Sequence, residues 1–179
     1  MSNNVNSIRN YLDQFDLIFI EDYYQYLIND DNWKFVNSRS GYLRFFASEK
    51  YINKNGKPQT LEDLSTQNSI YYNLSNKQYL DVFDSQGKVI KVNSSSNFSS
   101  DTFEHIYLMV LKGYGIGLLP DFFINNSLPE HEKVKHVLED YKSSSCEQVL
   151  LKSIHSNNKC LKQVADQIKQ ILQSFENVY

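Results

Sequence analysis

The chain of 179 residues is predicted to adopt an α/β fold with mixed, mainly parallel sheets. Short apolar runs of strand length alternate along it with segments whose apolar residues recur every three or four positions, as on one face of a helix. One hairpin signal, the turn-like sequence 84–88 between two strand-like runs, adds an antiparallel insertion. A glycine-rich stretch at 112–123 joins a helical pattern directly to a buried strand.

The first half of the chain predicts helices by apolar spacing and strands by short apolar runs. In order, the elements are a short amphipathic helix at 5–15, strands at 17–20 and 41–47, a helix start at 58–64 and a strand at 69–72. Segment 33–36 is ambiguous between helix and strand. Thr60 is expected to cap the helix start, because Asp63 stands three residues later in the position of a capping box.

The second half continues the alternation. In order, the elements are hairpin strands at 79–83 and 89–92, a polar loop at 93–100, a helix at 101–112, strands at 115–119, 133–138 and 147–151, and a long amphipathic helix marked by Leu161, Val164, Ile168, Ile171, Leu172 and Phe175. One face of the helix at 101–112 is expected to be buried, namely Phe103, Ile106, Tyr107, Val110 and Leu111.

The glycines of the stretch 112–123 indicate close packing of a helix on a strand. Gly113 stands where the end of a helix takes a left-handed residue, and Pro120 ends the strand because it has no amide hydrogen for a ladder. A dinucleotide-binding loop would instead have the pattern Gly-x-Gly-x-x-Gly, after a strand and before a helix. Here the order is reversed, and the negative end of a helix dipole disfavours phosphate.

Composition indicates a globular protein with a sizeable core. Hydrophobic residues make up 41% of the chain, charged residues 22%, and the net charge is −3 without a Lys/Arg cluster, so no electrostatic footprint for nucleic acid is present. No apolar run is long enough to cross a membrane, and the first residues lack the pattern of a signal peptide. Two widely spaced cysteines, Cys146 and Cys160, favour a reduced, cytoplasmic setting.

No residue pattern predicts a metal site, a cofactor or an enzyme. The four histidines, at 105, 131, 136 and 155, are scattered and have neither helical metal-ligand spacing nor nearby cysteines. The Gly-x-Ser-x-Gly motif of serine hydrolases is absent, and acidic residues are spread evenly along the sequence. We therefore expect surface histidines, a solvated acidic face and no catalytic residues.

Two polar places are candidate binding positions. Asn97–Thr102 precedes the helix at 103–112, with Asp101 or Ser100 as the expected N-cap, and its hydroxyls and free amides could receive a small anionic ligand. Ala47 and Ser48 stand where a strand ends. Ligands of open α/β sheets lie at the carboxyl ends of strands, so both places are candidates for a cleft, although capping alone also explains the first.

Several motifs, in this order, resemble the effector-binding domain of LysR-type transcriptional regulators. Gly56–Leu64, Gly-Lys-Pro-Gln-Thr-Leu-Glu-Asp-Leu, is similar to the family's Gly-x-Pro-x-Thr-Pro-Glu-Asp-Leu, and Gly113–Phe122 is similar to its Gly-Leu-Gly-Ile-Ala-Leu-Leu-Pro-Asp-Phe. Further similar segments are Phe15–Ile18, Tyr42–Ser48 followed by Tyr51, the hairpin around Gly87, and Val137–Tyr141. Together they cover most of the chain.

The resemblance implies a periplasmic-binding-protein-like fold of two α/β lobes that bind a small effector between them. Residues 1–47 and 147–179 would form the first lobe, and 48–146 the second. The residues that match cleft-lining stretches are Ala47, Ser48, Ser99, Ser100, Asp101 and Thr102. The family usually has an asparagine near Asp101, so the chemistry at that position departs from the pattern.

The resemblance also implies that the chain is an N-terminally truncated regulator. The winged helix-turn-helix and the opening elements of the first lobe would precede residue 1, so DNA would be bound only through that missing domain, and a homo-oligomer would be the expected assembly. A regulatory, non-enzymatic module is the leading hypothesis. The alternatives are a stand-alone cytoplasmic solute-binding module and, without any supporting residues, an enzyme on the same architecture.

Overall fold

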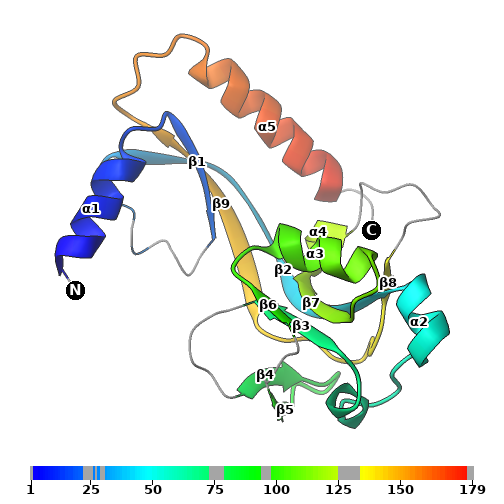
Figure 1. The fold of residues 1–179 in the computed structure, drawn as a ribbon. Helices are drawn as coiled ribbons and strands as arrows, with labels where there is room; N and C mark the ends of the chain where they lie inside the picture. Colours follow the sequence, from blue (N-terminus) through cyan, green and yellow to red (C-terminus); the bar gives the residue numbers. More distant parts are fainter. Residues whose placement is uncertain are drawn as a thin grey trace. The chain divides into compact units, whose positions relative to one another are not determined.

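The computed structural model describes residues 2–21, 26, 28, 31–72, 79–93, 98–124 and 134–176. The chain forms two compact units (Figure 1). The first consists of Met1–Ser40 and Cys146–Tyr179, and the second of Gly41–Ser145. Among the described residues, no helix has the length and apolar character needed to span a membrane.

The first unit is built on the antiparallel pair of β1 (Leu17–Glu21) and β9 (Ser145–Ser153), which pair from Leu17↔Lys152 to Glu21↔Gln148. The first part of β2 (Trp33–Ser48) lies beside β9, and the helices are α1 (Ser2–Leu12) and α5 (Leu161–Glu176). Trp33, Val149 and Leu151 form the core, with Leu12, Ile18, Ile20 and Ile28 packed against it. The indole Nε1 of Trp33 donates a hydrogen bond to Asp13 at 3.2 Å, so the buried ring keeps a polar partner.

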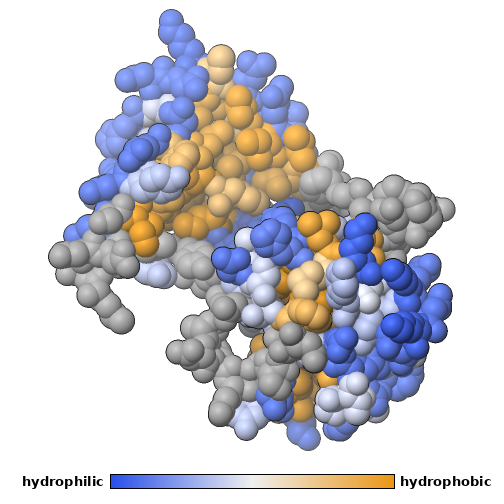
Figure 2. Space-filling view, in the orientation of Figure 1, coloured by the Kyte–Doolittle hydropathy of each residue, from blue (hydrophilic) through white to orange (hydrophobic). Residues whose placement is uncertain are grey.

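Apolar side chains gather on the visible face of the first unit (Figure 2). In α5, Leu161, Ala165 and Leu172 are buried, which agrees with the predicted amphipathic helix. Val164 and Ile171, which belong to the same predicted apolar set, are instead 41% and 54% exposed. The apolar stripe of α5 is therefore wider than the face that the described residues bury.

The second unit contains the remaining elements. They are α2 (Glu49–Asn55), the 3-10 helix η2 (Glu62–Ser65), β3 (Ser69–Tyr72), β4 (Tyr79–Phe83), β5 (Val89–Asn93), β6 (Phe98–Ser100), α3 (Phe103–Leu111), β7 (Ile116–Pro120), α4 (Asp121–Ile124) and β8 (Val134–His136). Its sheet has the order β8–β2–β7–β3–β6, and β4 and β5 form the predicted hairpin, paired from Tyr79↔Asn93 to Phe83↔Val89.

The predicted mixed sheet is confirmed, but the expectation of mainly parallel pairing is wrong. Among the described strand pairs, only β7–β3 and β3–β6 are parallel, because β1, β2 and the hairpin pair with antiparallel neighbours. The second half of β2 is antiparallel to both β7 and β8. Phe46, Gly117, Ile70 and Phe98 lie side by side in one row across β2, β7, β3 and β6. Because neighbours in a row point to the same face, this row faces α3, which packs against Gly117.

The glycines of the stretch 112–123 have the roles that close packing requires. Gly113 has φ +81°, which confirms the left-handed residue after α3. A Cβ on Gly117 would lie 2.3 Å from Val110 Cγ2 of α3, and a Cβ on Gly115 would lie 2.5 Å from the Asn68 carbonyl oxygen. The prediction of a helix packed tightly on a strand is therefore confirmed.

The structure resolves one ambiguous segment and differs from two local predictions. The ambiguous segment 33–36 is the beginning of the long strand β2. The predicted polar loop at 93–100 contains the strand β6, while its residues 94–97 lie outside the described part. The expected helix start at 58–64 is the short 3-10 helix η2, which has Leu61 and not Thr60 at its N-cap position. The Asp63 carboxylate accepts from the Thr60 amide, so only the reverse half of the predicted capping box forms.

Candidate functional site

The N-terminus of α3 is shaped by hydroxyl groups. Thr102 is the N-cap, with φ −134° and ψ 140°, and its Oγ1 accepts from the His105 amide at 3.4 Å. The prediction of Asp101 or Ser100 as the cap is therefore wrong. Ser100 lies too early, and its Oγ instead accepts from the Thr102 amide at 3.3 Å, which holds the residue before the helix in place.

Two backbone amides remain available at this helix end. The His105 amide is used by the cap, and the Ile106 amide donates to the Thr102 carbonyl. Within the described part of the chain, the amides of Phe103 and Glu104 have no acceptor. A helix of nine residues also places partial positive charge at this end. The two amides can therefore donate to a carboxylate or another small anion.

Side chains around these amides add further polar groups. The Ser100 hydroxyl lies 3.3 Å from His105 Nδ1, and Ser99 and Asp101 are exposed. Beneath them, the ring of Phe103 packs on Tyr72 with centroids 4.6 Å apart, which anchors the first turn of α3 to β3. We call Ser99–Thr102 with the first turn of α3, where the sequence resemblance predicts effector contacts, the effector edge.

Ala47 and Ser48, the other two predicted site residues, lie elsewhere in the second unit. Both are buried, at 0% and 4% exposure, and Ser48 Oγ accepts from the Tyr51 amide at 3.3 Å as the N-cap of α2. Ser48 also lies beside Gly113, because a Cβ on that glycine would be 3.3 Å from Ser48 Oγ. Ser48 therefore lies between the N-terminus of α2 and the C-terminal end of α3, which carry opposite partial charges.

The strand register explains why the two predicted groups are apart. Ser48 and Ser100 each lie two residues beyond the row of Phe46 and Phe98, but β2 and β6 run in opposite directions. The two residues are therefore separated by roughly 13 Å along the strands and roughly 14 Å across them. The structure brings Ser99, Ser100, Asp101 and Thr102 together and leaves Ala47 and Ser48 three strands away, toward the opposite end of the strands.

Sequence reasoning missed His105, which lies at the effector edge, and Arg44, which lies on the more distant strand β2. His105 was expected to be an ordinary surface histidine, yet it contacts Ser100. Arg44 lies in the same row as Tyr72 and Ser100, and its Nε donates to Asp121 at 3.2 Å. A single charged residue inside the apolar run 42–47 was the available signal for Arg44. Among the described residues, no three His, Cys, Asp or Glu side chains cluster as metal ligands.

Comparison with known proteins places the chain in a family. The family model "LysR substrate binding domain" matches residues 2–172. The HTH-type transcriptional regulator CrgA of Neisseria meningitidis serogroup C (strain 8013) is 29% identical over 98 residues, which are 54% of this chain and 32% of CrgA. The aligned segment thus spans about a third of that relative's length.

Solved structures show the same fold. The regulatory domain of CrgA from Neisseria meningitidis has a TM-score of 0.69 at 21% identity, covering 92% of this chain and 79% of that domain. The regulatory domain of AphB from Vibrio vulnificus has a TM-score of 0.60 at 18% identity, covering 88% and 76%. The predicted periplasmic-binding-protein-like α/β fold is confirmed. As its motifs predicted, the chain belongs to the LysR substrate-binding domain family of LysR-type transcriptional regulators.

Proposed function

We propose that the chain is the effector-sensing part of a cytoplasmic, non-enzymatic transcriptional regulator that acts as a homo-oligomer. The family match and the regulatory role of CrgA support this proposal. DNA would be contacted through a helix-turn-helix domain of the kind that the name of CrgA records. The two lobes predicted at 1–47 with 147–179 and at 48–146 would correspond to the two compact units.

The effector edge is the proposed binding position, and the unpaired amides of Phe103 and Glu104 carry this proposal. A carboxylate of the effector would accept hydrogen bonds from both amides, with the Ser100 hydroxyl as a third group in reach. Ala47 and Ser48 stay predicted site residues. Because both residues are buried, their proposed role is to hold the site in shape, with Ser48 capping the start of α2.

The negative charge of Asp101 restricts the chemical class of effector that the edge can bind. Asp101 is exposed and precedes the N-cap of α3, so its charge would disfavour a simple anion bound at this helix end. An effector that carries a hydroxyl or amino group next to its carboxylate can donate to Asp101 while the amides bind the carboxylate. Small hydroxy acids or amino acids therefore fit the edge better than simple carboxylates do.

A titration followed by ¹⁵N NMR tests this proposal with L-lactate and acetate as probes. L-lactate is expected to shift the amide resonances of Phe103 and Glu104 saturably, and acetate to bind more weakly. Ser100→Glu places a carboxylate at the edge and should abolish both shifts, whereas Ser65→Glu on η2 is the matched control and should leave them unchanged. Asp101→Asn should increase the affinity for acetate by about three- to fivefold, because it removes one nearby negative charge. Unchanged lactate binding by Ser100→Glu would contradict the assignment.

A further inference from the structure

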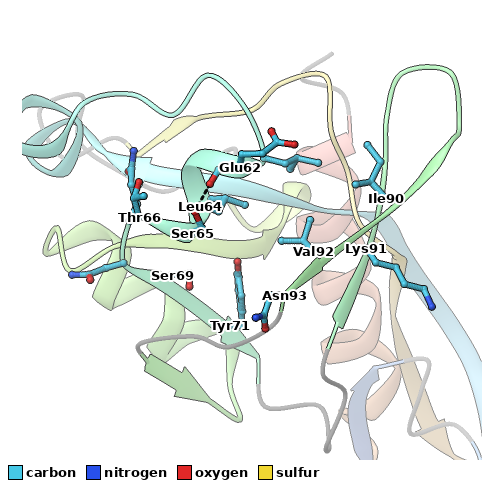
Figure 3. A pocket seen from close by; sticks show the side chains of 13 residues that line it. Glu62, Leu64, Ser65, Thr66, Ser69, Tyr71, Ile90, Lys91, Val92 and Asn93 are labelled. Carbon is cyan, nitrogen blue, oxygen red and sulfur yellow. Dashed lines mark hydrogen bonds between the residues drawn. The ribbon is translucent and has the colours of Figure 1, made fainter.

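A pocket of about 610 Å³ lies in the second unit, away from the effector edge (Figure 3). Its walls are η2 with the residues that follow it, the beginning of β3, and β5. Tyr71 lines it, whereas the next residue, Tyr72, packs on Phe103 of α3. Successive residues of a strand point to opposite faces, so the pocket and α3 lie on opposite faces of the sheet.

Most residues that line the pocket are polar, but three apolar side chains form a wall within it, and its volume is in the range usual for a small-molecule site. Leu64, Ile90 and Val92 supply the apolar wall. The Tyr71 hydroxyl points toward η2 between these side chains (Figure 3). Burial raises the pKa of Tyr71 more than its hydrogen bond with the Ser69 side chain lowers it, so this hydroxyl keeps its proton and can donate.

Gln67 provides an independent indication of a ligand. It lines the pocket, and its Oε1 is shielded from water without a hydrogen-bond partner. Buried acceptors are nearly always paired in folded proteins, so this unpaired oxygen would be satisfied if the Gln67 side chain turned it toward an N–H donor in the pocket. The second unit thus offers one unpaired acceptor and one protonated donor near the same apolar wall.

The charges around the pocket indicate that its ligand is neutral. The charged residues that line it are Glu62 and Lys91, one on each wall, and both are exposed. Their charges cancel, and neither has an ion-pair partner among the described residues. The helix in the pocket wall, η2, has only four residues, so its dipole contributes little there. This environment contrasts with the effector edge, where a helix dipole favours anions.

We propose that the pocket between η2 and β5 is a second ligand site, which binds a small neutral molecule with an apolar body and a carboxamide group. The amide N–H of the ligand would donate to Gln67 Oε1, and its carbonyl oxygen would accept from the Tyr71 hydroxyl. The apolar body would pack on Leu64, Ile90 and Val92. Nothing in this site depends on the effector edge, so the two proposals can fail separately.

Benzamide and benzoate are a matched pair of probes for this proposal, because they share a ring and differ in the carboxamide. In a ¹⁵N NMR titration of the whole chain, benzamide is expected to shift the resonances of 64–71 and 90–93 saturably, without shifting those of 99–105. Benzoate at equal concentration should leave 64–71 and 90–93 unchanged. Absence of saturable shifts at millimolar benzamide, or equal shifts with benzoate, would overturn the proposal.

Two variants assign the hydrogen bonds. Tyr71→Phe and Gln67→Met should each lower the affinity for benzamide about tenfold, the factor that corresponds to the loss of one hydrogen bond between neutral groups. Gln67→Met also removes an unpaired buried acceptor, so it should raise the urea midpoint of the ligand-free chain. A merely structural role for Gln67 would lower that midpoint. Thr102→Ala, at the effector edge, is the control and should keep benzamide affinity.

Discussion

Thr102 illustrates how a single residue decides which groups a site can offer. Its extended backbone ends the segment after β6, and its hydroxyl oxygen accepts a hydrogen bond from the His105 amide. The Phe103 and Glu104 amides then remain without acceptors among the described residues. Had Ser100 been the cap, as its type allowed, the helix would begin earlier and a different pair of amides would be open.

His136 is a second residue with a specific consequence, namely a pH dependence of stability. Burial lowers its pKa below the ordinary value of 6.5, and the charges of Arg44 and Lys57 act in the same direction, against Glu139 and Asp121. Its Nε2 is shielded from water and has no hydrogen-bond partner. Protonation therefore puts an unpaired charge in a half-buried place.

We expect the free energy of unfolding to fall as the pH decreases below about 6.5. The unfolded chain takes up the proton at a higher pH than the folded chain does. The stability that depends on neutral His136 is therefore fully present above pH 6.5 and is lost as the pH falls below that value. Urea unfolding at pH 7.5 and 5.5 measures this difference. His136→Phe keeps a ring beside Phe46 and should reduce the difference in unfolding free energy between the two pH values. An unchanged difference in that variant would show that His136 is not its source.

At the scale of elements, the packing of α3 on β7 depends on Gly117. Because a Cβ there would lie 2.3 Å from Val110 Cγ2 and 3.0 Å from Ile106 Cγ2, Gly117→Ala should destabilise the chain by about 1–3 kcal/mol. Val110→Ala removes the closer methyl group, so the same glycine substitution should cost less in that background. Urea unfolding of the four variants of this double-mutant cycle measures the coupling. Equal costs in the two backgrounds would show that the contact is not limiting.

Elements with a strong local pattern were predictable from the sequence, and elements defined by tertiary pairing were not. The helix α3, the strand β7 and the hairpin follow from apolar spacing, glycine position and turn chemistry. β6 is a strand because Phe98, Ser99 and Ser100 pair with β3, although their sequence lacks apolar alternation. The resemblance named the effector-edge residues, but it could not place Ser48, whose position depends on the reversed direction of β2.

At the scale of the whole molecule, the second unit carries the two proposed sites on opposite faces of one sheet. The effector edge lies on the face of α3, and the pocket lies on the face of Tyr71. β3 contributes to both, through Tyr72 and Tyr71. Their opposite preferences, for an anion and for a neutral amide, mean that the same small molecule is a poor ligand for both.

The two sites are therefore expected to stabilise the chain additively. A ligand at 100 times its Kd adds about 2.7 kcal/mol to the free energy of unfolding, which for a domain of this size raises Tm by roughly 5–10 °C. L-lactate and benzamide together should give the sum of their separate stabilisations, because groups that share no contact do not couple strongly. Differential scanning calorimetry with each ligand and with both measures this sum.

Competition between L-lactate and benzamide would contradict the predicted additivity. If benzamide at saturation removed the stabilisation by L-lactate, both molecules would occupy one site, and the separation of the two faces by the sheet would be irrelevant to binding. Ser100→Glu distinguishes the remaining cases, because it should remove the lactate increment and leave the benzamide increment intact. Tyr71→Phe should do the reverse. Only two independent sites on the opposite faces of β3 account for both selective losses, since a shared site would lose both increments in each variant.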